Sequence, residues 1–377
     1  MSGNRKTKTK TKDHKAARII WRVCAMFLTT VLMVFVGAYG ALWIFCHGPS
    51  VAARDLFVST ILETGAMKFL AGWYFDKDEI LEITSNNSMG VSDSDVDVDL
   101  IRIPSDGEGA DNDAAGGGTA YQDDFDENGI QIIKVTGRSY MGKIMIVKDP
   151  SKVRVATIYP WSNSPQEKGG LTLDALVDRA GAVAGINGGE YQSAGNWGGK
   201  PKGLVVCNGE IQYNKPERGD VMVGMNTDNI LVIKDISGMS AAQVEELVAE
   251  NHIRDAVSFK DIDDGDTNHF TKLIINGEAR AISGNGSGAN PRTVIGQRED
   301  GAILMFVTDG RGHEGHIGAT AADIIGVMQE YGAVNAANLD GGSSSSMYYD
   351  GAFEMNSVTL YYSTSSWKLP TAFVVEP

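Results

Sequence analysis

Three groups of polar residues in the C-terminal half of the sequence come directly after short apolar runs and are interleaved with glycine. Glycine lets the backbone turn sharply, so the polar side chains beside it are presented at the end of a strand. Each group alone is ordinary, because Asn-Gly and Asp-Gly are common turn dipeptides. Together they bring carboxylates, amides and guanidinium groups into one domain, which is typical of a reactive site. The groups are Asn187 to Tyr191 (NGGEY), Asn290 to Thr293 (NPRT) with Thr308 to Arg311 (TDGR), and Asn338 to Met347 (NLDGGSSSSM).

These residue types suit cleavage of the bond between a sugar and a phosphate. Breaking a sugar C1–O bond passes through an oxocarbenium-like state, which a carboxylate can stabilise or attack. Asp309 and Asp340 are therefore predicted to share the roles of nucleophile and water-activating base, in an order that the sequence leaves open. Arg292 and Arg311 are predicted to hold the departing phosphate, because the planar guanidinium fork matches phosphate oxygens. The glycine-rich turns would add backbone N–H donors.

The order of these motifs resembles the phosphodiester glycosidase family, over about residue 140 to the C-terminus. The resemblance implies an enzyme that hydrolyses sugar-1-phosphate diesters. It is strongest in the NLDGGSSSSM string. The sequence departs from the family pattern at His316-Ile317-Gly318, where a Ser before the Gly is more usual. By this likeness the site motifs include Asn187, Glu190, Arg292, Thr293, Asp309, Arg311, Asp340, Gly341 and Gly342, with Glu190 predicted as catalytic and Ser343 added to the substrate-binding set.

Two other readings of the same residues stay open. A non-catalytic glycan-binding or export assembly protein could keep such a fold, although a binder has no need of paired carboxylates beside paired arginines. The second open reading is metal-assisted hydrolysis of the phosphodiester at phosphorus instead of at the sugar carbon. The string His313-Glu-Gly-His316 lacks the spacing of a helical zinc motif, and its glycines disfavour a helix. We therefore predict no definite cofactor, and leave a divalent cation open.

Charge excludes one class of partner. The chain has a formal net charge of −15, and eight Lys/Arg stand against one acid before Val23, so the remainder is more acidic still. A nucleic-acid-binding domain needs a basic surface in its folded part. We expect a glycosyl phosphate substrate and a membrane contact, and no nucleic acid.

The membrane contact is predicted from residues 23–46, an uncharged run behind the basic leader. A helix of this length crosses a hydrocarbon core of about 30 Å. Basic flanks stay in the cytoplasm, which predicts a single-pass anchor with the N-terminus inside and the C-terminal domain outside the cell. A cleaved signal peptide is the alternative, and the length of the run favours the anchor.

The rest of the chain is expected to form one α+β domain, a mixed β-sheet with a few helices, from residue 129 onward. Helices are expected over residues 173–180, 241–251 and 321–331, the second with a Ser240–Gln243 capping box. Short apolar runs with turn signals predict strands over residues 130–136, 143–147, 154–158, 182–186, 204–206, 221–223, 230–233, 272–275, 294–296, 303–308, 334–339 and 371–375. The predicted parts are a basic cytoplasmic tail (1–22), the anchor (23–46), a juxtamembrane helical segment (47–84), an acidic disordered linker (85–128) and the catalytic-type domain (129–377).

Overall fold

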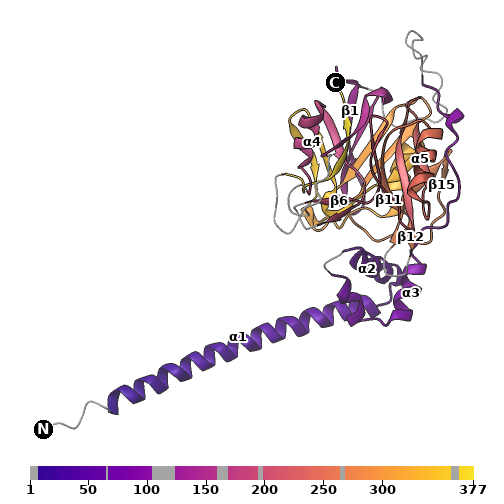
Figure 1. The fold of residues 1–377 in the computed structure, drawn as a ribbon. Coiled ribbons are helices and arrows are strands. Elements are labelled where there is room, and N and C mark those ends of the chain that lie inside the picture. The colour runs from indigo at the N-terminus through magenta and orange to yellow at the C-terminus, as the bar shows by residue number, and fades with distance from the viewer. Residues whose placement is uncertain are drawn as a thin grey trace. The chain divides into compact units, whose positions relative to one another are not determined.

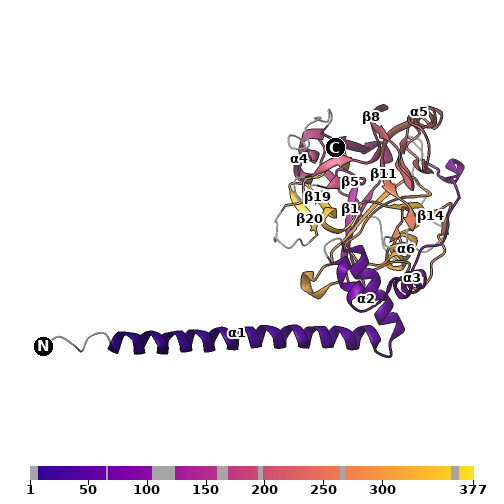
Figure 2. The ribbon, with the colours of Figure 1, turned by 60° about the horizontal axis from the view of Figure 1, so that its bottom comes forward.

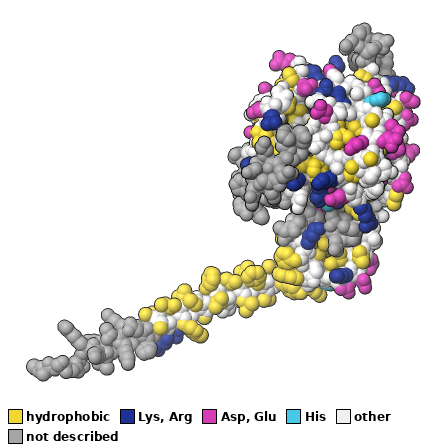
Figure 3. Space-filling model, in the orientation of Figure 1, with side chains coloured by type: hydrophobic (Ala, Val, Ile, Leu, Met, Phe, Trp, Pro, Cys, Tyr) yellow, Lys and Arg dark blue, Asp and Glu magenta, His cyan; other side chains and the backbone are white. Residues whose placement is uncertain are grey.

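The structure is a computed structural model that describes residues 7–64, 67–103, 124–158, 169–193, 198–263, 268–357 and 365–377. The chain divides into two compact units, residues 1–54 and residues 55–377. The first unit is dominated by α1 (Thr7–His47), and hydrophobic side chains cover most of the described surface of this helix (Figure 3). Its part from Lys15 to His47 is long and apolar enough to cross a membrane, with a mean hydropathy of 2.2 over its best window.

The second unit is built on three antiparallel sheets (Figure 1). The 7-stranded sheet has the order β1-β2-β17-β16-β18-β14-β15, and the two 5-stranded sheets have the orders β10-β9-β11-β7-β8 and β20-β19-β4-β21-β3. The strands of the first are β1 (Ile130–Thr136), β2 (Met141–Val147), β14 (Lys272–Ile275), β15 (Glu278–Ala279), β16 (Thr293–Arg298), β17 (Ile303–Thr308) and β18 (Ala333–Asn338). The other two contain β7 (Gly203–Cys207), β8 (Glu210–Lys215), β9 (Asp220–Asn226), β10 (Leu231–Asp235) and β11 (Ile253–Lys260), and β3 (Val153–Thr157), β4 (Ala184–Asn187), β19 (Ser346–Tyr349), β20 (Ala352–Asn356) and β21 (Thr371–Val375).

One apolar cluster joins the inner faces of all three sheets, with Met305, Val223 and Phe373 as members from each in turn. Three helices cover outer faces. The helix α6 (Ala321–Glu330) packs on the 7-stranded sheet, α5 (Ala241–Glu250) on the sheet of β9, and α4 (Leu173–Ala180) on the sheet of β21. This arrangement of helices and antiparallel sheets confirms the predicted α+β class.

The two faces of β16 lead to different surroundings. Side chains alternate along a strand, so Ile295 points into the central cluster and Val294 points toward α6. Thr293 follows the first face, because its hydroxyl is hydrogen-bonded to Asn187. The neighbouring Arg292 follows the second, because its guanidinium lies over the ring of Phe270, a member of the α6 cluster. Arg292 and Thr293, which are adjacent in the sequence, therefore lie on opposite sides of the sheet.

The segment between α1 and the sheets is more structured than predicted. It forms α2 (Val51–Glu63), a short 3₁₀ turn (Lys68–Trp73) and α3 (Lys77–Ser85), whose capping box joins Asp76 and Glu79. Figure 2 shows α2 and α3 at the end of the second unit where α6 lies. A helical segment over residues 47–84 was predicted, but its placement inside the compact unit of residues 55–377 was not.

The prediction of a disordered linker over residues 85–128 is wrong for the first part of that range. Met89 forms a β-bridge with Ile282, and the ammonium of Lys272 donates to two carbonyls of the segment, those of Ser92 and Ser94. These backbone contacts offset the low apolar content on which the prediction relied. The domain boundary expected at residue 129 is wrong for the same reason, and residues 104–123 of the predicted linker lie outside the described residues.

Candidate active site

The site is built around the sharp turn that follows β18, where Asp340 leaves the sheet. Gly341 lies so close to the next strand that a Cβ there would meet the carbonyl oxygen of Pro291 at 2.8 Å. Gly342 has a φ of +62°, and a Cβ on it would lie 2.5 Å from Nη2 of Arg311. Both positions therefore require glycine. The turn brings Asp340 next to the guanidinium of Arg311.

Asn187 ties the polar motifs together from the end of β4. Its amide nitrogen donates to the carbonyl oxygen of Asp340 at 2.5 Å. Its amide oxygen accepts from the hydroxyl of Thr293 at 2.7 Å and from the backbone N–H of Ser346 at 3.1 Å. Asn187 is only 1% exposed. Asn187 and Thr293 thus lie below the site, where they hold the Asp340 turn in place instead of facing a ligand.

The carboxyl group of Asp340 has an unusual protonation equilibrium. Its pKa is raised to about 7, mainly by burial and in addition by the negative charge of Glu190. The hydrogen bonds from Ser344 and from the backbone N–H of Gly341, together with the charge of Arg311, lower the pKa without offsetting that rise. A carboxyl group that titrates near neutral pH suits proton transfer, since it holds its proton loosely enough to give it and firmly enough to take it.

Glu190 supplies the second carboxylate, from the turn between β4 and β5 (Tyr191–Ser193). Its Oε1 accepts from the ammonium of Lys202 at 2.6 Å. Its Oε2 is buried and has no hydrogen-bond partner among the residues that the structure describes. A buried carboxylate oxygen without a partner is costly, so its position is explained best by a ligand that completes it. Gly189 allows this turn, because a Cβ there would lie 2.5 Å from the carbonyl oxygen of Ser258.

Arg311 extends from the turn after β17, with a φ of +55°. Its Nη1 donates to the hydroxyl of Ser343 at 2.6 Å, which links the TDGR and NLDGGS motifs across the site. The side chain is exposed, so guanidinium N–H groups are accessible to a ligand. Ser343 and Gly342 thus lie together with Arg311, in the same turn as Gly341.

Asp309 is placed differently from Asp340. It is 1% exposed, and its Oδ1 accepts from the backbone N–H of Met141 at 2.8 Å. Its Oδ2 lies 2.7 Å from Nδ1 of His316, a ring that keeps a quarter of its surface exposed. With both oxygens engaged, Asp309 is in a geometry that orients the histidine rather than one that attacks a sugar.

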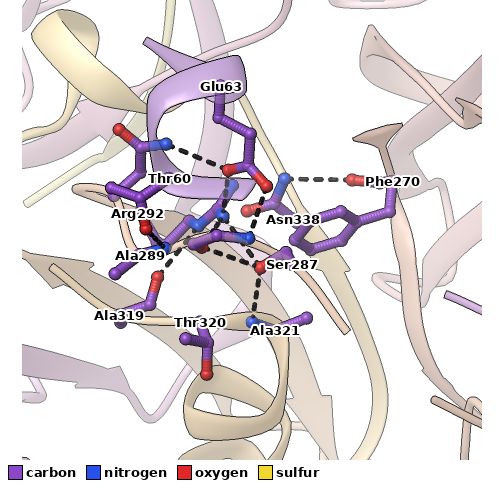
Figure 4. A network of polar contacts seen from close by, with 12 residues as sticks. Thr60, Glu63, Phe270, Ser287, Ala289, Arg292, Ala319, Thr320, Ala321 and Asn338 are labelled. Carbon is purple, nitrogen blue, oxygen red and sulfur yellow. Dashed lines mark hydrogen bonds and ion pairs between the residues drawn. The ribbon is translucent and has the colours of Figure 1, made fainter. Parts of the chain in front are cut away.

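Arg292 does not join this group (Figure 4). Its Nη2 donates to the carboxylate of Glu63 at 2.6 Å, to the hydroxyl of Ser287 at 2.9 Å and to the carbonyl of Gly288 at 2.7 Å. Its Nε donates to the carbonyl of Ala319 at 3.2 Å. These partners lie on the α6 face of the sheet, opposite Thr293. The expected pair of phosphate-binding arginines therefore does not face one ligand from the same side: Arg292 is buried in a network of its own, although its charge still acts on Arg311.

Glu63 completes that network from the last residue of α2. Its Oε1 accepts from the backbone N–H of Gly288 at 2.7 Å, and its Oε2 accepts from the side-chain amide of Asn290 at 2.9 Å. The glycine-rich stretch 284–288 is packed against α2 and the end of α3, with Ser287 fully buried.

Three residues of the site were not predicted as part of it. Lys202, the partner of Glu190, carries no motif that would have marked it. Ser344 is hydrogen-bonded to Tyr191 at 3.2 Å and lies inside a serine run whose members the sequence could not distinguish. His316 was noticed only as a departure from the family pattern and as half of a zinc-like string. No group of three His, Cys, Asp or Glu side chains suited to a metal is found among the described residues.

Comparison with known proteins shows the family of the chain. The sequence profile of the phosphodiester glycosidases matches residues 180–376, more than half of the chain. The chain belongs to the phosphodiester glycosidase family. The matched part of this phosphodiester glycosidase contains Glu190, Arg311, Asp340 and the turns that carry them, and begins after the α2 segment.

Individual relatives are distant. An uncharacterized prophage-derived protein of Bacillus subtilis (strain 168), YomE, is 39% identical over 67 residues, which make up 18% of this chain and 10% of that protein. Among solved structures, the zebrafish N-acetylglucosamine-1-phosphodiester alpha-N-acetylglucosaminidase catalytic domain, auto-inhibited by its pro-peptide, is 18% identical with a TM-score of 0.45, covering 66% of this chain and 82% of that one. A hypothetical protein from Synechocystis is 15% identical with a TM-score of 0.41, covering 65% and 61%.

Proposed function

We propose that this phosphodiester glycosidase is a membrane-anchored hydrolase outside the cytoplasm that cleaves the sugar C1–O bond of glycosyl-1-phosphate diesters on cell-surface glycans. The observation that carries the proposal is the carboxyl group of Asp340, with a pKa of about 7, beside the charges of Glu190 and Arg311. The two carboxyl groups can act on the sugar, and the guanidinium at the same glycine-rich turn can bind the phosphate.

The two carboxyl groups divide the chemistry at the sugar. Glu190, with its unpartnered Oε2, is suited to face the positive charge that develops on C1 as the bond breaks. Asp340 in its ionised form is suited to accept the proton of the water that adds to C1, since its pKa lies near the working pH. Asp309 moves from the predicted nucleophile or base to a residue that holds His316.

The departing phosphate needs positive charge more than it needs a proton, because it is already a good leaving group. Arg311 can supply that charge as a planar fork, and Ser343 fixes the orientation of the fork. The backbone N–H groups of the Gly341-Gly342 turn are further donors to an anion. No metal ion is required for these roles, and the involvement of a divalent cation stays a prediction.

The location of the substrate follows from α1. Basic residues precede the apolar helix, so its N-terminal end is expected inside and the catalytic unit outside the cell. A protease added to intact cells should then remove the residues after α1 and spare an epitope at the N-terminus. Protection of the catalytic unit in intact cells, with cleavage after lysis, would contradict the location without touching the chemistry.

The decisive experiment is hydrolysis of a sugar-1-phosphate diester in ¹⁸O-water, with mass analysis of both products. We expect the label in the sugar, because water adds to C1. Label in the phosphate would mean attack at phosphorus, and would favour metal-assisted phosphodiester hydrolysis. Absence of turnover by the purified full chain on sugar-1-phosphate diesters, combined with binding of the same compounds, would favour a glycan-binding protein. The Asp340→Asn variant is the control for a contaminating hydrolase.

A further inference from the structure

We propose that His316, held by Asp309, is a second phosphate-binding residue that acts together with Arg311. The inference rests on the proposed function, since it assigns the phosphate of that same substrate. It replaces Arg292, which the sequence suggested as the second cation and which the structure buries against Glu63 on the other face of the sheet. The ligand chemistry is that of a phosphodiester monoanion.

The geometry of the pair fixes which ring nitrogen is available. Asp309 lies 2.7 Å from Nδ1 of His316, so Nδ1–H donates to the carboxylate. Among the described residues, Nε2 of His316 has no hydrogen-bond partner, and a quarter of the side chain is exposed. A ring anchored at one nitrogen and accessible at the other is pre-oriented for a ligand.

The charge of the pair favours an anion as that ligand. When the ring is protonated, Nδ1–H donates to the buried carboxylate of Asp309, and the second N–H is left for a ligand. An imidazolium presents a positively charged N–H donor at Nε2, which forms a charge-assisted hydrogen bond with a phosphate oxygen.

The backbone of His316 lies beside that of Arg311 in one loop. Residues 309–318 fold back on themselves, since the N–H of Arg311 donates to the carbonyl of Ile317 at 3.3 Å and that of Gly312 to the carbonyl of His316 at 2.6 Å. The base of the loop is fixed by Gly318, whose N–H and carbonyl are both hydrogen-bonded to Ser139. His316 and Arg311 are therefore opposite each other across a short loop, and the guanidinium of Arg311 reaches Ser343 beside Asp340.

Several charged groups act on the histidine besides Asp309. Glu314 and Arg311 come from its own loop, and Arg138 precedes the Ser139 contact in the β1–β2 turn. Glu190 and Asp340 are the carboxyl groups on the other side of Arg311. Asp309 is the group in direct contact with the ring. Because the protonated ring is the form that donates from Nε2, phosphate binding should weaken when rising pH removes the proton of His316.

The test uses the full chain and dimethyl phosphate, a probe that keeps one negative charge over the whole pH range of interest. The NMR signals of the His316 ring would be followed as a function of pH, with and without the probe. Binding should move the titration of the ring to higher pH, because a ligand that prefers the protonated ring must in turn stabilise it.

Variants separate charge from structure. His316→Asn keeps a side-chain donor for Asp309 but has no charge, and should weaken dimethyl phosphate binding about 10-fold at pH 6, the scale of one charge-assisted hydrogen bond. His316→Lys restores a charge that persists to high pH, so binding should recover and lose its pH dependence. His252→Asn, at an exposed turn beyond α5, is the matched control and should change nothing.

Two outcomes would overturn the proposal. One is a His316 titration that dimethyl phosphate does not move, and the other is unchanged binding by a folded His316→Asn variant. Failure of the proposed function is a separate result. If the chain hydrolyses no sugar-1-phosphate diester but the probe still moves the His316 titration, the phosphate site stands and the assigned reaction does not.

Discussion

The two arginines that the sequence treated as equivalent occupy opposite kinds of environment. Arg292 is buried, and its N–H groups donate hydrogen bonds to a carboxylate, a hydroxyl and two carbonyl oxygens. These partners come from three separate segments of the chain. Arg311 is exposed, donates a hydrogen bond to the hydroxyl of Ser343, and lies beside a carboxyl group whose pKa is raised to about 7. A fully satisfied cation stabilises the fold, whereas groups left incomplete are available to a ligand.

The largest effect is expected at the site of Arg311 and Asp340, where polar groups are left available to a ligand. Asp340→Asn keeps the shape of the side chain but removes the charge and the titration near neutral pH. Turnover should fall by about 10²–10⁴-fold, the range of acid–base and electrostatic contributions, with the substrate still bound. Steady-state kinetics with a p-nitrophenyl glycosyl phosphate measure this. Normal turnover by a folded variant would remove Asp340 from the mechanism.

In the Arg292 network, where the N–H groups have partners, a substitution is expected to reduce the stability of the fold. Glu63→Ala leaves the guanidinium of Arg292 buried without its counter-charge, which should lower the free energy of unfolding by about 3–5 kcal/mol. Chemical denaturation of the second unit measures it, and activity per folded molecule should be unchanged. The matched control is Glu299→Ala, which breaks an exposed pair with Arg102 and should cost less than about 1 kcal/mol. Equal losses for both variants would contradict the assignment of a structural network.

The same substitution at both arginines tests the comparison directly. Lysine keeps the charge but loses the planar fork. Arg311→Lys should reduce kcat/KM on the order of 10²-fold, the scale of one preorganised donor, with little change in melting temperature. Arg292→Lys should lower the melting temperature and leave the kcat/KM of the folded fraction near that of the unmodified chain. Reversal of the two results would mean that Arg292 reaches the substrate.

The sequence could place the motifs at strand ends but could not say which face of the sheet each side chain takes. Thr293 and Arg292 are adjacent in one motif, and alternation sends them to opposite sides. The sequence distance between Arg292 and Glu63 is so large that no local pattern connects them. Which of two neighbouring polar residues belongs to a site is decided by such tertiary partners.

The elements themselves show where local patterns suffice. Helix α4 and strands β1, β14, β17 and β21 have the predicted bounds, and the Ser240–Gln243 capping box of α5 is confirmed, because apolar periodicity and capping act locally. Strand β11, central in its sheet, was missed because Asp255 interrupts its apolar run. That buried carboxylate accepts from the backbone N–H groups of Val155 and Asn208 and is paired with Arg254, partners that only the folded chain supplies.

The smallest expected effect concerns the free energy of folding that is lost because Asp340 is buried at the site. Because burial raises the pKa of Asp340 to about 7, the folded chain holds this proton more tightly than the unfolded chain does. The group therefore penalises folding progressively as pH rises from about 4 to 7, since the ionised form is disfavoured only in the folded state.

Asp340→Asn removes this penalty. The difference in unfolding free energy between the variant and the unmodified chain should therefore shift in favour of the variant between pH 5 and pH 8, on the order of 1 kcal/mol once screening at this half-buried side chain is allowed for. Denaturation at the two pH values measures the shift, and the other titrating groups cancel in the difference. Glu299→Ala, far less buried, should show no such shift. A variant that is destabilised equally at both pH values would mean that Asp340 is ionised as easily in the folded chain as in the unfolded one, and that its place beside Glu190 and Arg311 costs no stability.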